Sequence, residues 1–279
     1  MMRELLELRL SAEEAALYVP GYANQGLDPL DTVRLHLETH DPLVEELRAV
    51  EAGYRARGTT LFTMCAVRRH YTPRELQAAE RLKVEFWPFF MPSGEECGTR
   101  YDEARACPLC GAGAPQLGEL RLNVGRIPKS RDLAFTPGAE FIVSSRLVKA
   151  MRARRITGFE LRPVLSKGGK PTDAWHQLII PSATVKTAPP TFFGRSYLAP
   201  EPDETRCPKG HVLGRRLLSP LHVKRSSLQP LDWQALKGLL GSRQGLFRPH
   251  PLFIISQRLY RLLKELKVRN LNEEVAHVG

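Results

Sequence analysis

Apolar and polar residues alternate along this chain at two different spacings, and the spacing changes near Gly58. Before that point the pattern is typical of helices. Asp31 is expected to cap a helix that runs through about His40, and Asp41-Pro42 combines a second cap with proline at the first helical position. The second helix has one apolar face, formed by Leu43, Leu47, Val50 and Tyr54. Residues 1–58 are therefore predicted to form a helical N-terminal segment.

After Gly58 the pattern changes to alternating strands and helices. Residues 60–70 are rich in β-forming side chains. Thr72-Pro73-Arg74-Glu75 has the form of a capping box with proline at the first helical position. Residues 84–89 return to strand character. This stretch is predicted to form one strand–helix–strand unit.

The same kind of unit recurs twice further along the chain, and these two copies are separated by a constant offset of 112 residues. Residues 141–147 (Phe-Ile-Val-Ser-Ser-Arg-Leu) resemble residues 253–259 (Phe-Ile-Ile-Ser-Gln-Arg-Leu). The match continues without a gap through four further pairs: Met151 with Leu263, Ile156 with Val268, Gly158 with Asn270, and Phe159 with Leu271. Each copy predicts an apolar strand, a serine N-cap (Ser144 or Ser256), a helix, a stop residue and a second strand. The two strands of each copy are expected to pair in parallel.

These patterns predict an α+β fold that arose by tandem duplication. The duplicated domain is expected at residues 59–279, with halves at about 95–187 and 188–279. Chance similarity between two amphipathic helices is the alternative, and the ungapped register favours duplication.

Two short cysteine-proline segments precede the two copies and contain the candidate metal ligands. We call Cys107-Pro108-Leu109-Cys110-Gly111 the first knuckle and Cys207-Pro208-Lys209-Gly210-His211 the second knuckle. Zinc in structural sites takes four thiolate or imidazole ligands in a tetrahedron. Each knuckle offers two ligands, so neither closes a site alone. We therefore predict one shared zinc held by Cys107, Cys110, Cys207 and His211.

The residues leave two alternatives open for this site. A Cys-x-x-Cys pair can be redox-active at a helix start, but Gly111-Ala112-Gly113-Ala114-Pro115 does not open a good helix. His211 could be an ordinary surface histidine, and Cys97 would then be the best replacement ligand. With four protein ligands no position stays open for water, so the expected zinc is structural.

The other residues point away from catalysis. An odd count of five cysteines, two of them in Cys-x-x-Cys, favours metal over disulfides, and Cys65 lies in an apolar run as a buried small side chain. The chain has no HExxH, deaminase-type HxE, Walker A, GxSxG or glycine-rich dinucleotide motif. We predict a non-enzymatic protein with no catalytic or organic-cofactor residues. An enzyme of unrecognised type, which a deep polar pocket near the knuckles would favour, is a further alternative.

The net charge of +11 is unevenly distributed. Residues 1–58 have a balance of −5, residues 59–204 of +6, and residues 205–279 of +10. A basic face attracts nucleic acid, an anionic membrane or an acidic protein. Because the basic residues are dispersed and form no run, the sequence favours an ordinary solvated surface. A nucleic-acid-associated zinc-ribbon protein that uses the basic C-terminal third is the alternative function.

The hydropathy pattern gives an expectation for the compartment. No apolar run approaches the roughly 20 residues that a membrane span requires. The first residues, Met-Met-Arg-Glu-Leu-Leu-Glu, carry acids where a signal peptide needs an apolar stretch. We therefore expect a cytoplasmic protein that has no membrane partner.

The knuckles resemble those of a known family, the double-CXXCG motif proteins of myxobacteria. The matching residues are Cys107, Cys110 and Gly111 in the first motif and Cys207-Pro208 in the second, and the segment at 156–164 also matches in style. The resemblance covers roughly residues 59–279. It implies a bacterial immunity protein that protects the cell from a toxin exchanged with its kin.

Two departures and the charge refine this expectation. The second motif lacks its second cysteine, and residues 1–58 are not part of the family pattern. Immunity proteins that block nucleases are usually acidic, because they imitate nucleic acid. A balance of +11 argues against a nuclease as the target. The expected partner is therefore an acidic or neutral cognate toxin, neutralised by occlusion of its active site.

Overall fold

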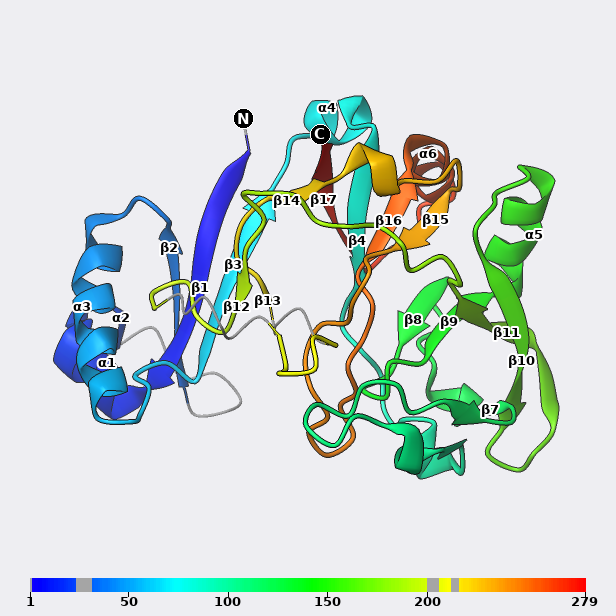
Figure 1. Ribbon diagram of the computed structural model, residues 1–279, viewed down its shortest axis with the longest axis horizontal. Coiled ribbons are helices and arrows are strands. Elements are labelled where there is room, and N and C mark those ends of the chain that lie inside the picture. The colour runs from blue at the N-terminus through cyan, green and yellow to red at the C-terminus, as the bar shows by residue number, and fades with distance from the viewer. Residues whose placement is uncertain (1, 24–31, 200–205, 212–215) are drawn as a thin grey trace.

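The computed structural model describes residues 2–23, 32–199, 206–211 and 216–279, and it shows the expected mixture of helices and strands (Figure 1). An N-terminal unit lies on the left of Figure 1, and two five-stranded sheets fill the centre and the right. Within the described residues, none of the helices has both the length and the apolar character of a membrane span.

The N-terminal unit is a three-stranded antiparallel sheet with the order β2-β1-β3. Its strands are β1 (Arg3–Ser11), β2 (Thr32–Glu38) and β3 (Met64–His70). The helices α1 (Ala12–Tyr18), α2 (Pro20–Ala23) and α3 (Pro42–Ala56) lie beside it. Six strand side chains are at most 2% exposed and form the centre of the unit's core: Leu6, Leu8, Leu10, Val33, Leu35 and Leu37.

The predicted helix from Asp31 to His40 is wrong. Asp31 itself lies outside the described residues, and Thr32–Glu38 is a strand. Its buried positions alternate with a period of two, which matches a strand with one face on the core. The second predicted helix is confirmed as α3, where Asp41 Oδ1 accepts from the N–H of Leu43 at 2.9 Å. Residues 1–58 are thus mixed, and their sheet takes β3 from beyond position 58.

The first predicted strand–helix–strand unit is present, but its two strands belong to different sheets. Helix α4 (Pro73–Ala78) begins with the expected capping box between Thr72 and Glu75. β3 belongs to the N-terminal sheet, whereas β4 (Arg81–Phe86) is the middle strand of a five-stranded sheet. The unit therefore connects the N-terminal part to the rest of the molecule.

The two five-stranded sheets have the same strand order and the same strand directions. The first sheet has the order β7-β10-β11-β9-β8 and the second has β14-β17-β4-β16-β15. In each sheet the first pair is parallel and the other three pairs are antiparallel. The first sheet's strands are β7 (Leu120–Leu122), β8 (Leu133–Phe135), β9 (Phe141–Ser144), β10 (Glu160–Ser166) and β11 (Pro171–Ile179). The second sheet's later strands are β14 (Leu221–Val223), β15 (Trp233–Ala235), β16 (Phe253–Ser256) and β17 (Leu271–Val278).

Four short strands form two further small sheets. β5 (Arg100–Tyr101) pairs with β6 (Gln116–Leu117) on either side of the first knuckle. β12 (Phe193–Gly194) pairs with β13 (Arg216–Leu217) on either side of the second knuckle.

The two strands that flank the helix of each copy are parallel but do not pair with each other. β9 and β10 lie on opposite sides of β11, and β16 and β17 lie on opposite sides of β4. An antiparallel middle strand thus takes the place of the expected direct pairing. The second sheet's middle strand, β4, also lies outside both predicted halves, 95–187 and 188–279.

Both sheets and the helices α5 (Ser145–Ala153) and α6 (Gln257–Glu265) share one hydrophobic core. Phe141 and Phe253 occupy matching positions in the two copies, and their rings meet edge to face with centroids 4.7 Å apart. Phe86 of β4 contacts both rings, at 5.5 and 5.7 Å. Such a pair adds about 1 kcal/mol to the burial of its surface.

The two helices begin in the same way. Ser144 and Ser256 cap them, and each serine hydroxyl also donates to a buried aspartate, Asp132 or Asp232. Burial opposes ionisation of Asp232. Donors from Arg258, Ser256 and Thr157 outweigh it, so that the pKa of Asp232 lies below its usual range.

Asp232→Asn should therefore destabilise the protein in a pH-dependent manner. The native carboxylate stabilises the fold above the unfolded pKa of about 4, and this contribution disappears as the pH falls through the lowered folded pKa. The variant should lose about 1–3 kcal/mol of unfolding free energy at pH 7 and approach the parent near pH 2–3. Urea unfolding across this pH range measures the difference. A gap that stays constant with pH would contradict the assignment.

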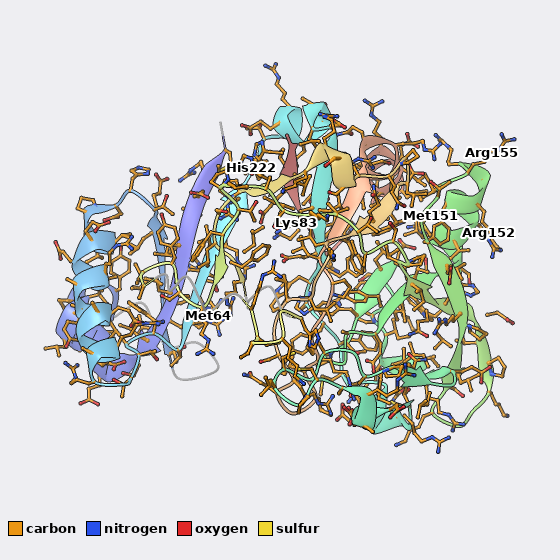
Figure 2. The ribbon with its side chains drawn as sticks, in the orientation of Figure 1. Met64, Lys83, Met151, Arg152, Arg155 and His222 are labelled. Carbon is orange, nitrogen blue, oxygen red and sulfur yellow. The ribbon has the colours of Figure 1, made fainter. Side chains whose placement is uncertain are left out.

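A buried network of charges joins the N-terminal sheet to the second five-stranded sheet. Glu274 of β17 is 2% exposed, and its carboxylate lies 2.8 Å from Lys83 Nζ and 3.4 Å from Arg69 Nη1. Arg69 also pairs with Glu4 of β1 at 2.7 Å. Figure 2 shows Lys83 in the middle of the molecule. Removal of the Glu274 carboxylate would leave buried Arg69 and Lys83 with only the more exposed Glu4 and Glu85 as partners, which compensate their charge less well.

Glu274→Gln should cost about 3–5 kcal/mol of unfolding free energy. Glu80→Gln is the matched control, because Glu80 pairs with Arg225 at 3.0 Å while both side chains are more than half exposed. The control should cost less than about 1 kcal/mol. Denaturant titration of both variants decides the point, and equal losses would contradict the role given to the buried network.

Candidate metal centre

The first knuckle is a tight turn held by its own backbone. The N–H of Gly111 donates to the carbonyl of Cys107, and the N–H of Cys107 donates to the carbonyl of Ala112, both at 2.7 Å. Gly111 has a φ of +73°, and a Cβ there would lie 2.3 Å from Cβ of Arg243. The conformation and the close approach both require glycine. Both cysteines are buried.

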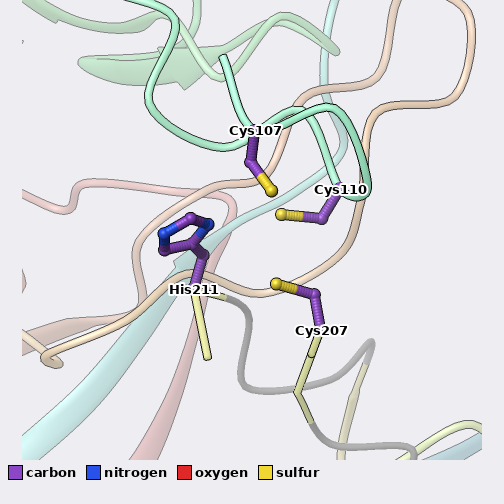
Figure 3. Close-up of side chains that lie close together, drawn as sticks. All are labelled: Cys107, Cys110, Cys207 and His211. Carbon is purple, nitrogen blue, oxygen red and sulfur yellow. The ribbon is translucent and has the colours of Figure 1, made fainter. Parts of the chain in front are cut away.

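The second knuckle forms a similar turn at the other side of the site. The N–H of Gly210 donates to the carbonyl of Cys207 at 2.7 Å, and Gly210 has a φ of +72°. Cys207 is half-buried and His211 is exposed. Glycine at this position turns the chain so that His211 follows Cys207 on the same side as the first knuckle (Figure 3).

The structure brings together all four residues that the sequence predicts as ligands. The ligand atoms of Cys107, Cys110, Cys207 and His211 all lie within 4.8 Å of one another. Figure 3 shows the three sulfurs and the imidazole facing a common centre. A tetrahedron with metal–sulfur bonds of about 2.3 Å has edges of about 3.8 Å. The donor set and its spacing therefore fit a metal ion of the zinc type.

The protonation of the thiols shows what a cation would contribute. Burial, together with the neighbouring Cys107 and Cys207, raises the pKa of Cys110 to about 11. Burial acts in the same direction on Cys207, but N–H groups of His211 and Lys209 outweigh it and lower the pKa of Cys207. Thiolates packed this closely repel one another, and a divalent ion compensates their charge.

A third segment, the loop at residues 236–252, completes the site. The N–H of Arg243 donates to the carbonyl of Cys110 at 2.8 Å, and the N–H of Leu239 lies 3.4 Å from the carbonyl of His211. The side chain of Leu239 packs on the cysteines. This loop joins β15 to β16. The loop in the matching place of the first copy, residues 136–140, is twelve residues shorter.

The sequence predicts a longer insertion in the second half, because Cys107 lies 34 residues before Phe141 and Cys207 lies 46 residues before Phe253. It does not predict that the inserted loop contacts both knuckles. Cys107 and Cys207 are 100 residues apart, whereas Phe141 and Phe253 are 112 apart. The difference shows that twelve extra residues lie between the second knuckle and β16. Asp132 and Asp232 are also 100 residues apart, so aligning one with the other places the twelve extra residues after β15.

Ion pairs anchor the loop to the neighbourhood of the first knuckle. Arg243 binds both oxygens of Glu95, at 3.0 and 2.9 Å, and Arg248 lies 3.2 Å from the same carboxylate. Arg248 also pairs with Glu103 and lies over the ring of Tyr101, 3.8 Å from its centroid. These contacts hold the loop in place independently of the ligands.

Four protein donors give this centre the composition of a structural site. An open cavity of about 420 Å³ adjoins it, lined in part by Arg105, Lys209 and His211. The proposed substitute ligand Cys97 is 4% exposed and lies outside the four-residue group found among the described residues. Cys65 is buried as predicted, at 5% exposure, in the core of the N-terminal unit.

Comparison with known proteins assigns neither a family nor a function to this chain, because no protein-family model and no curated protein matches it. The resemblance to double-CXXCG proteins therefore stays a prediction that rests on the knuckles.

Purified protein should contain one zinc ion per chain, and Cys207→Ala should lose it. Loss of the ion should lower the thermal midpoint by about 10 °C or more, because structural zinc contributes several kcal/mol to folding. Metal analysis and thermal unfolding measure both effects. Cys97→Ala is the control, since it removes a buried thiol outside the group and should keep the zinc. Retention of zinc by the Cys207 variant, or its loss from the control, would refute the ligand set.

Proposed function

We propose that this chain is a non-enzymatic binding protein whose body is fixed by one structural zinc ion. The ligands are Cys107, Cys110, Cys207 and His211. The single observation that carries this proposal is the convergence of four donors from knuckles 100 residues apart. A closed site of this kind holds chain segments together and leaves the metal no position for substrate.

We propose further that the two sheets descend from a tandem duplication, with the knuckles as its zinc-ribbon-like pair. Identical strand order and directions support it. The helices also contact each other reciprocally: Arg146 donates to the carbonyl of Leu266 at 3.2 Å, and Arg258 donates to the carbonyl of Arg155 at 3.0 Å. Reciprocal contacts of this kind are expected at a twofold axis between two copies.

The positions of β4 and β11, the middle strands of the two five-stranded sheets, favour an exchange of one strand between the two copies. β4 precedes the first knuckle and β11 precedes the second, so each copy reads as a strand, a knuckle and then four strands with one helix. On that division β4 enters the sheet of the second copy, and β11 enters the sheet of the first. Each half would then complete the other half's sheet, which supports a single rigid body.

The role that the family resemblance implies is immunity to a cognate toxin by occlusion. A rigid surface suits this role, because less conformational entropy is lost when it covers a partner. The duplicated core, the zinc and the anchored loop supply that rigidity. The chain's charge of +11 favours an acidic or neutral partner.

Co-expression with the toxin encoded by a neighbouring gene tests this role. The chain should rescue growth, form a stable complex with the toxin, and lose both properties in Cys207→Ala. Growth rate and co-purification at fixed expression level give the readout, with Cys97→Ala as the matched control. Absence of rescue and of a complex would refute the immunity role and leave the zinc assignment intact.

A further inference from the structure

Helices α5 and α6, together with the turns that follow them, carry most of the excess positive charge of the protein. Residues 145–155 contain five basic and no acidic side chains, and residues 257–269 contain five basic side chains and Glu265. The two balances, +5 and +4, account for nine of the eleven net charges. All ten basic side chains are exposed. Their spacing in the sequence looks dispersed, because each helix also supplies apolar residues to the core.

The fold unites these charges on one surface. The start of α5 contacts the end of α6 through Arg146, and the start of α6 contacts the end of α5 through Arg258. The start of each helix therefore lies near the end of the other, and Arg154 and Glu265, at the ends of the two helices, form an ion pair at 3.0 Å. Figure 2 shows Arg152 and Arg155 on the outer side of α5. We call the exposed surface of residues 145–155 and 257–269 the basic ridge.

Six cations of the basic ridge have no ion pair among the described residues: Lys149, Arg152, Arg155, Arg261, Lys267 and Arg269. The other four bind Asp132, Asp232, Glu265 or Glu273. Six unneutralised charges on packed helices repel one another, and a polyanion would relieve this repulsion.

Exposed aromatic side chains lie at one end of the basic ridge. The side chain of Trp87 is 54% exposed, and the backbone N–H of Trp87 donates to the carbonyl of Asn270, the residue after Arg269, at 3.0 Å. Phe89 lies edge to face with Trp87 and with Phe247, which is 50% exposed. Aromatic faces next to cations are the means by which proteins hold single strands, because bases stack while phosphates meet the charges.

We infer that the basic ridge and Trp87 form a binding site for single-stranded nucleic acid. This function goes beyond the zinc-fixed binding protein proposed above and uses a different surface. Two observations favour nucleic acid over other polyanions. The apolar sides of both helices are buried in the shared core, so they have no surface to insert into a membrane. Seven of the ten cations are arginines, which bind phosphate in a bidentate manner.

The binding of fluorescent oligo-dT and oligo-U to the zinc-loaded full chain tests this inference. At about 50 mM salt the strand should bind in the micromolar range, and six phosphate contacts predict a log–log salt slope of about −4. The ridge variant Arg152→Glu/Arg155→Glu/Arg261→Glu should weaken binding at least about tenfold and reduce the slope by about two. Trp87→Ala should weaken binding about fivefold or more and abolish the quenching of tryptophan fluorescence.

A second triple variant, with the same change in charge on a different surface, is the control. Arg100→Glu/Arg121→Glu/Lys167→Glu changes three exposed cations near β5, β7 and the β10–β11 turn, and should bind as the parent does. Circular dichroism confirms the fold of each variant. The inference is overturned by absent binding at 100 μM protein, by equal losses in both triple variants, or by equal affinity for duplex DNA. Equal affinity for polyglutamate or for phosphatidylglycerol vesicles would also overturn it, in favour of an acidic protein or a membrane.

Discussion

The convergence of four donor side chains from two knuckles is the constraint at the centre of this account, and a tetrahedral metal ion would require all four of them. Each knuckle supplies two donors, so the centre exists only when residues 107–110 and 207–211 meet. Their meeting requires the two sheets to be packed in one relative orientation. The loop at 236–252 then closes the arrangement, because it binds backbone groups of both knuckles.

We propose that the apolar core supplies most of the stability and that a metal bound at the knuckles would select one arrangement. The shared core buries aromatic residues from both sheets, and each large apolar side chain contributes about 2–3 kcal/mol. Burial of this kind is tolerant of small shifts, whereas coordination bonds are directional. The buried pairs of Arg69 and Lys83 with Glu274 act similarly between the N-terminal sheet and the second sheet. The apolar core favours a compact state, whereas the four-donor centre and the Glu274 ion pairs favour one relative placement of the sheets.

Local signals in the sequence were sufficient where short-range chemistry decides the structure. The serine caps at Ser144 and Ser256, the Asp41-Pro42 start and the capping box at Thr72 all appear as predicted. The four donors were also predictable, because the two knuckles are short motifs with few other uses. Their convergence was an inference from ligand number, and the structure bears out the spacing.

Longer-range features could not be predicted from local patterns. A helix capped by Asp31 and running through about His40 was predicted, but pairing with β1 makes residues 32–38 a strand. The position of β4 is set by partners far along the chain, since Val84 pairs with Phe253 and with Glu273. The basic ridge is also invisible in the sequence, where its cations are separated by core residues. Each of these features depends on contacts between distant segments.

X-ray absorption at the zinc edge of the purified protein tests the central claim most directly. The account predicts a first shell of three sulfur atoms at about 2.3 Å and one nitrogen at about 2.0 Å. A protein without zinc, or a shell dominated by oxygen and nitrogen donors, would contradict it.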